Sequence, residues 1–156
     1  MSVVLSLFHA AQACASVGTG LLSAMAIYNL KQREGQAETA AQWSNMAAHQ
    51  LHKTRTTQTI GALATVSSLV SSVILAIGPS SDRSKWPFML SLTNAIGIAL
   101  TYKHLRNFWR NKAKALYLSD YNEGITASNQ MRQVLGVLAV SWAVVTVMYL
   151  WQLTLN

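Results

Sequence analysis

Four long runs without aspartate, glutamate, lysine or arginine constrain the fold more than any other feature of the sequence. A helix of about 20 apolar residues crosses a hydrocarbon core of roughly 30 Å. Each run reaches that length or comes close to it, so we expect four transmembrane helices. The runs are residues 1–30, 56–81, 86–102 and 133–156. The helices are predicted over about residues 3–30, 57–78, 86–105 and 132–154.

The composition favours the same fold class. Charged residues make up 11% of the chain, whereas soluble domains carry about 25%. A soluble helical bundle is the alternative, but it needs a polar face on each helix, and residues 66–77 and 135–150 carry no charge. A signal peptide cleaved near Ala13-Cys14-Ala15 is a second alternative; no basic residue precedes that site, so we expect a retained helix. We predict an all-α, integral membrane four-helix bundle over residues 1–156, with an additional amphipathic helical segment on the cytoplasmic side.

The basic residues are divided unequally between the two faces that four crossings create. Only Arg83 and Lys85 lie in the second connection. Because lysine and arginine are in excess on the cytoplasmic side of membrane proteins, we predict that the connections at residues 31–56 and 103–131 are cytoplasmic. Both termini are then lumenal or extracellular. These connections and the start of the last span hold ten of the 12 basic residues: Lys31, Arg33, Lys53, Arg55, Lys103, Arg106, Arg110, Lys112, Lys114 and Arg132.

The net charge of +7 also raises the question of nucleic-acid binding. A nucleic-acid site needs a basic stripe interleaved with base-stacking aromatic residues, whereas the basic residues here flank hydrophobic runs. Anionic headgroups of the cytoplasmic leaflet account for the charge more simply. We therefore expect a lipid bilayer with anionic headgroups as a partner, and no nucleic acid.

The connections carry three local signals. Residues 36–56 contain no glycine or proline, and apolar residues recur there at helical spacing: Ala40, Trp43, Ala47 and Leu51. This pattern predicts an amphipathic helix that lies at the cytoplasmic interface or extends the second transmembrane helix. Residues 78–83 have the composition of a tight polar turn. In the third connection we predict that the third helix continues beyond the membrane and that residues 121–124 form a turn.

Candidate chemistry gathers at the cytoplasmic ends of the predicted helices. His49 and His52 are three residues apart and share a helical face, and His104 ends the third span on the same side. An imidazole base, with an arginine that stabilises developing negative charge, suits proton abstraction from a hydrophobic phenolic or carbonyl substrate. The same histidines are alternative ligands for a transition metal, although solvated histidines are the favoured interpretation and no cofactor is expected. The predicted catalytic residues are His49, His52, His104, Asn129 and Arg132.

Three further residues are candidates for substrate binding. Asn94 lies halfway along the third span, where an unpaired amide is costly, so it should bond across helices or face a cavity. Trp142 lies about 15 Å beyond Arg132 along the last helix, near the middle of the membrane. Arg106 stands at the cytoplasmic end. No acidic residue lies within a span, which disfavours a transporter with an intramembrane carboxylate.

The layout resembles that of the small anthrone oxygenase-like membrane proteins, which have four helices. Gly18-Thr19-Gly20 is similar to their glycine-rich first helix, and Asn129-Gln130-Met131-Arg132 to the Asn-x-x-Arg with which their fourth helix begins. Further correspondences are His49 and His52 before the second helix, and Asn107 and Asn111 after the third. The resemblance implies an oxidoreductase of secondary metabolism that modifies a polycyclic aromatic or phenolic substrate.

The function we expect is a small integral-membrane enzyme, an oxygenase or related tailoring enzyme, with acid–base chemistry at the cytoplasmic end of the bundle. Its partner would be a hydrophobic small molecule. The alternative is a noncatalytic structural or assembly subunit of a larger membrane complex, for which packing is the function. A homo-oligomer or a membrane complex is the expected assembly. Geometry discriminates between them, because an enzyme needs His49 or His52 near Asn129 or Arg132 around a cavity.

Overall fold

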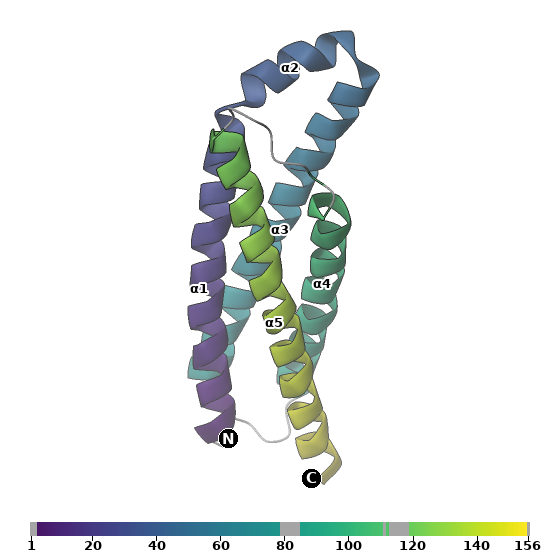
Figure 1. Ribbon diagram of the computed structural model, residues 1–156. Coiled ribbons are helices and arrows are strands. Elements are labelled where there is room, and N and C mark those ends of the chain that lie inside the picture. The colour runs from purple at the N-terminus through teal and green to yellow at the C-terminus, as the bar shows by residue number, and fades with distance from the viewer. Residues whose placement is uncertain (1–2, 79–84, 111, 113–118, 156) are drawn as a thin grey trace.

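The computed structural model describes residues 3–78, 85–110, 112 and 119–155, and within them the chain forms five α-helices and no strand. The predicted all-α class is confirmed for this part. Four of the helices are long, and one short helix lies across one end of the molecule (Figure 1). The helices are α1 (Val3–Lys31), α2 (Glu34–Trp43), α3 (Asn45–Ile77), α4 (Trp86–Trp109) and α5 (Ser119–Leu155).

The long helices pack side by side, with α1 and α4 each in contact with both α3 and α5, while α2 packs mainly on α3. The C-terminal ends of α1 and α4 therefore meet the N-terminal ends of α3 and α5 near α2 (Figure 1). We call this part of the molecule the basic end, defined as residues 31–55, 103–110, 112 and 119–124. The start of α1 and the end of α5 lie at the opposite, far end. Both connections predicted to be cytoplasmic thus share one end, as that topology requires.

The surface of the long helices is apolar and much of their interior is polar, which reverses the usual distribution in soluble proteins. Leu63 of α3 and Val140 of α5 are 64% and 66% exposed, whereas Ser68 and Gln12 are buried. Hydrocarbon surroundings favour this arrangement. Apolar side chains are well solvated by lipid, whereas polar side chains must form hydrogen bonds with one another between the helices. The buried polar residues are His9, Gln12, Ser16, Thr19, Ser23, Asn29, Thr57, Gln58, Thr65, Ser68, Ser71, Ser72, Ser91, Asn94, Thr101, Ser128 and Thr146.

Three helices, α1, α3 and α5, are long and apolar enough to cross a membrane. They are the helices expected of a multi-pass membrane protein. The third predicted span, residues 86–105, is also helical, and α4 continues to Trp109 as expected. However, α4 is not among the three, since its 24 residues include Pro87, Asn94 and Lys103, which lower its mean hydropathy. The fourth crossing stays a prediction.

The amphipathic segment predicted over residues 36–56 is not one helix, although its second part, residues 45–56, does extend the second transmembrane helix as the prediction allowed. It breaks at Ser44, whose backbone is extended (φ −146°, ψ 116°), and the Ser44 hydroxyl accepts a hydrogen bond from the Ala47 amide at 3.4 Å. Ser44 therefore begins α3 as its N-cap, and α2 ends one residue earlier. The shared apolar face is lost with the break, because Trp43 is 86% exposed while Leu51 is half-buried.

The turn predicted over residues 121–124 is wrong, because α5 already begins at Ser119. Gly124 is needed there for packing. A Cβ atom at this position would lie 2.8 Å from Leu30 Cγ and 3.6 Å from the Ala26 carbonyl oxygen. The missing side chain thus lets α1 and α5 approach closely. The other predicted turn, over residues 78–83, lies outside the described residues apart from Gly78.

Candidate ligand pocket

The far end holds a chain of buried hydrogen bonds between α1 and α5. His9 Nδ1 lies 2.9 Å from Gln12 Oε1, His9 Nε2 lies 2.9 Å from the Tyr149 hydroxyl, and Gln12 Nε2 donates to Ser141 Oγ at 3.0 Å. Because Gln12 Oε1 only accepts, the proton of the neutral imidazole is on Nδ1, and Nε2 accepts from Tyr149. Every polar atom of the His9 ring is therefore paired within the protein.

The middle of the molecule is held together by hydroxyl groups of α3. Ser68 Oγ receives hydrogen bonds from Trp142 Nε1 and from Ser16 Oγ, both at 2.9 Å, and so joins α1, α3 and α5. Asn94 of α4 donates to Ser71 Oγ at 2.8 Å and accepts from Ser67 Oγ at 3.1 Å. Two of the predicted substrate-binding residues, Asn94 and Trp142, thus have their polar atoms bonded to neighbouring helices. This geometry is typical of interhelical packing.

The three histidines predicted near the cytoplasmic side are not gathered into one site. His49 and His52 are exposed near the start of α3, and His104 Nε2 lies 3.2 Å from Thr57 Oγ1. Among the described residues, no group of three histidine, cysteine, aspartate or glutamate side chains is placed to hold a metal ion. The metal site considered from the sequence is therefore not formed by these three histidines in this structure.

The remaining predicted residues are also dispersed. Asn129 donates to the Ile125 carbonyl of its own helix at 3.1 Å, and Arg106 is exposed. Arg132 is half-buried in a groove on the outer face of α4 and α5. His49 and His52 line neither this groove nor the pocket described next. The convergence that we required of an enzyme, a histidine near Asn129 or Arg132 around a cavity, does not occur at either of these two hollows.

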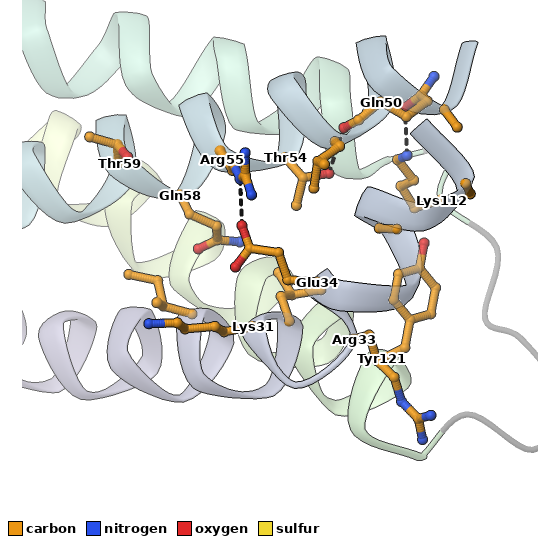
Figure 2. Close-up of a pocket in the computed structure, with 16 residues that line it drawn as sticks. Lys31, Arg33, Glu34, Gln50, Thr54, Arg55, Gln58, Thr59, Lys112 and Tyr121 are labelled. Atoms are coloured by element: carbon orange, nitrogen blue, oxygen red, sulfur yellow. Dashed lines mark hydrogen bonds and ion pairs between the residues drawn. The ribbon is translucent and has the colours of Figure 1, made fainter. Parts of the chain in front are cut away.

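A pocket of about 440 Å³ opens at the basic end, between the last turn of α1, the inner side of α2 and the first turns of α3 (Figure 2). Aliphatic side chains form much of its wall, and charged or polar groups surround them. The aliphatic residues are Ile27, Leu30, Ala37, Ala40, Ala47 and Leu51. The polar and charged ones are Lys31, Arg33, Glu34, Gln50, Thr54, Arg55, Gln58, Thr59, Lys112 and Tyr121.

Ion pairs hold α2 in place over the pocket. Arg55 of α3 pairs with both Glu34 and Glu38 of α2, and Figure 2 shows the first of these contacts. The hydrogen bonds that Arg55 donates to Glu34 and then to Glu38 raise the pKa of Arg55. Arg33, just before α2, pairs with Asp120 of α5 at 3.1 Å. Both arginines at the pocket are therefore already neutralised by carboxylates.

Lys112 is a different kind of cation. Its Nζ donates to Gln50 Oε1 at 2.8 Å and lies 4.6 Å from the centre of the Phe108 ring (Figure 2 shows the Gln50 contact). Burial, and then the positive charge of Lys53, lowers the pKa of Lys112. Among the residues that the structure describes, no carboxylate pairs with it. The Lys112 ammonium is thus half-buried, next to a like charge and in contact with neutral groups.

Sequence reasoning placed a pocket at this end but missed the residues that line it. None of the eight predicted site residues is among them. Two signals were available. Ser44 is a strong N-cap residue within the segment treated as one helix, and Glu34 and Glu38 are one turn apart, as two carboxylates facing one arginine must be. A separate signal concerned the buried face of α1, not the pocket. Polar residues recur there at helical spacing: His9, Gln12, Ser16, Thr19 and Ser23.

Comparisons with known proteins add no relative. No protein-family model matches the chain, and neither curated proteins nor solved structures give a match.

Proposed function

We propose that the chain is an integral membrane protein whose four long helices all cross the bilayer, with the basic end on the cytoplasmic side. The α4 helix supports four crossings, because its 24 residues measure about 36 Å and it packs between the apolar helices α3 and α5. Its outer residues Met89, Ile96 and Leu100 are all more than half exposed, and hydrocarbon is the solvent that suits them. The gathering of basic residues at one end supports the orientation.

We further propose that the pocket at the basic end binds an amphiphilic anion, a molecule with one alkyl chain and a phosphate or carboxylate group. The observation that carries this proposal is the Lys112 ammonium, which lacks a carboxylate partner among the described residues and lies beside an aliphatic wall. An anion at Lys112 would relieve its repulsion with Lys53 and would compensate for its burial. The aliphatic wall, which includes Ile27 and Leu51, offers apolar area for the alkyl chain of the ligand.

Binding is favoured over chemistry by what lines the pocket. Glu34 is engaged by Arg55, and burial raises the pKa of Tyr121 further above neutral pH. Neither group is prepared to act as a general base. Oxygenation of a polycyclic aromatic substrate stays a prediction from the family resemblance, and turnover of such a substrate that depends on His49, His52, Asn129 or Arg132 would support it.

The test uses two lysolipids with the same acyl chain and different headgroups, the anionic lysophosphatidic acid and the zwitterionic lysophosphatidylcholine. Native mass spectrometry of the detergent-solubilised protein gives the apparent Kd of each. We expect the anionic lysolipid to bind more tightly and Lys112→Gln to weaken it about tenfold or more, the size expected for losing a hydrogen bond between charged groups. Binding of the zwitterionic lysolipid should change little.

The matched control is Lys103→Gln, which removes an exposed lysine of the same end that does not line the pocket. This variant should bind lysophosphatidic acid as the wild type does. Equal affinity for the two lysolipids, or an equal loss in both variants, would contradict the proposed site.

A further inference from the structure

A second hollow lies on the outer face of α4 and α5, away from the pocket formed by α1, α2 and α3. It has a volume of about 800 Å³, and its lining is almost entirely apolar. Val137 and Val140 of α5 are 69% and 66% exposed beside it, so this face would be covered by lipid. The residues that matter for the argument are Ala99, Tyr102, Arg132, Gly136, Val140 and Val144.

Among the described residues that line this groove, Arg132 is the only charged one. Its Nε atom is buried and has no hydrogen-bond partner among the residues that the structure describes, and no ion pair there includes it. A guanidinium in apolar surroundings needs an anion, and phosphate oxygens match its donor geometry in pairs. The groove therefore supplies the cationic donor group that a phosphate contact needs.

The length of the groove indicates what else the ligand contains. From Arg132 to Val144 the α5 helix rises by about 18 Å, close to the thickness of one leaflet, half of the roughly 30 Å hydrocarbon core. At Gly136 the Tyr102 ring packs directly against α5, since a Cβ atom there would lie 3.1 Å from that ring, and both residues line the groove. One acyl chain laid along this path would start at the leaflet boundary, where Arg132 lies, and would end near the bilayer centre.

We propose that this groove is a binding site for one phospholipid of the leaflet at the basic end, with an anionic headgroup. Its phosphate contacts the Arg132 guanidinium, and one acyl chain lies along Gly136, Val140 and Val144. The headgroup is anionic because the basic end attracts negative charge and none of the described residues that line the groove is acidic. The proposal depends on membrane insertion of α4 and α5 and is independent of the ligand in the pocket.

The experiment counts phospholipids that stay bound after gentle delipidation in detergent, by native mass spectrometry of protein supplied with equal amounts of phosphatidylglycerol and phosphatidylcholine. We expect the wild type to retain one phosphatidylglycerol. Arg132→Gln should weaken its binding about tenfold or more. Val140→Trp, which fills the groove from an exposed position and leaves the interior unchanged, should do the same.

Two control variants match these changes. Arg106→Gln removes an exposed arginine outside the groove, and Val147→Trp adds the same bulk at a 63% exposed position of α5 that does not line it. Both should retain the lipid, and so should Lys112→Gln, which separates this site from the pocket. Retention of phosphatidylglycerol by Arg132→Gln and Val140→Trp at the level of their controls, or equal retention of phosphatidylcholine by the wild type, would overturn the proposal.

Discussion

The interior between the long helices and the basic end are both polar, but they are polar in different ways. The interior uses uncharged side chains, and at the His9 chain and around Ser68 each one bonds to a partner on another helix. The basic end uses charged side chains, which are half-buried or exposed and form ion pairs around an open pocket. At those two places the interior polar groups bond to one another, whereas at the basic end Lys112 has no carboxylate partner among the described residues.

The surroundings of each region explain the difference. A charge in hydrocarbon costs several kcal/mol, so polar groups between membrane-crossing helices should be neutral and paired. Small hydroxyl residues meet this condition with little help, because their side chains also bond to the carbonyl one turn earlier on the same helix. Four buried threonines of the long helices do so: Thr19, Thr65, Thr101 and Thr146. At the basic end water and lipid headgroups would solvate charged side chains. The free-energy cost of keeping an unpaired cation beside an open pocket is therefore smaller there.

The largest effect should come from the interior. Trp142→Ala removes a fully buried indole and its hydrogen bond to Ser68, and should lower the free energy of unfolding by about 3–5 kcal/mol. Trp151→Ala, nine residues later on α5 and 66% exposed, is the matched control and should change it by less than about 0.5 kcal/mol. Denaturant titration in mixed micelles measures both. Similar losses in the two variants would mean that the buried hydrogen bonds and packing around Ser68 do not hold the helices together.

The smallest effect on stability should come from the basic end. Arg55→Gln breaks both ion pairs to α2, yet Arg55 is exposed and such pairs contribute little to global stability. The loss should appear locally, as faster backbone hydrogen exchange in α2 with an unchanged unfolding midpoint. Lys53→Gln, two residues earlier and outside the described ion pairs, should leave exchange in α2 unchanged. If α2 exchanges equally in wild type and Arg55→Gln, the ion pairs do not position it.

The positions of the helices were predictable because hydrophobicity is a local property. Each charge-free run overlaps one long helix over the described residues, and the basic residues at one end followed from their places between the runs. The contacts of His9 were not predictable, because Tyr149 is 140 residues away and the register of α1 against α5 depends on Gly124. Only the polar spacing from His9 to Ser23 could have indicated that this face is buried.

The pocket was harder to predict than the helices. Its shape depends on the break at Ser44, which separates α2 from α3 and places α2 over the first turns of α3. A single helix over residues 36–56, as predicted, would not place residues of α2 over the start of α3. The histidine pattern in the sequence predicted a site at His49 and His52, which are exposed in the structure. Lys112 was missed because its surroundings depend on Gln50 and Phe108, which come from two other parts of the fold.

The central claim is that the long helices cross the membrane, α4 included, and that the basic end faces one side of it. Cysteine labelling at the two ends of α4 tests this most directly. After replacement of the exposed Cys14 by alanine, single cysteines at the exposed positions Lys85 and Arg106 are treated with a membrane-impermeant maleimide in sealed cells and after permeabilisation. The account predicts that Lys85→Cys reacts from outside in sealed cells and that Arg106→Cys reacts only after permeabilisation. Reaction of both from the same side would show that α4 does not cross the membrane, and would contradict the account.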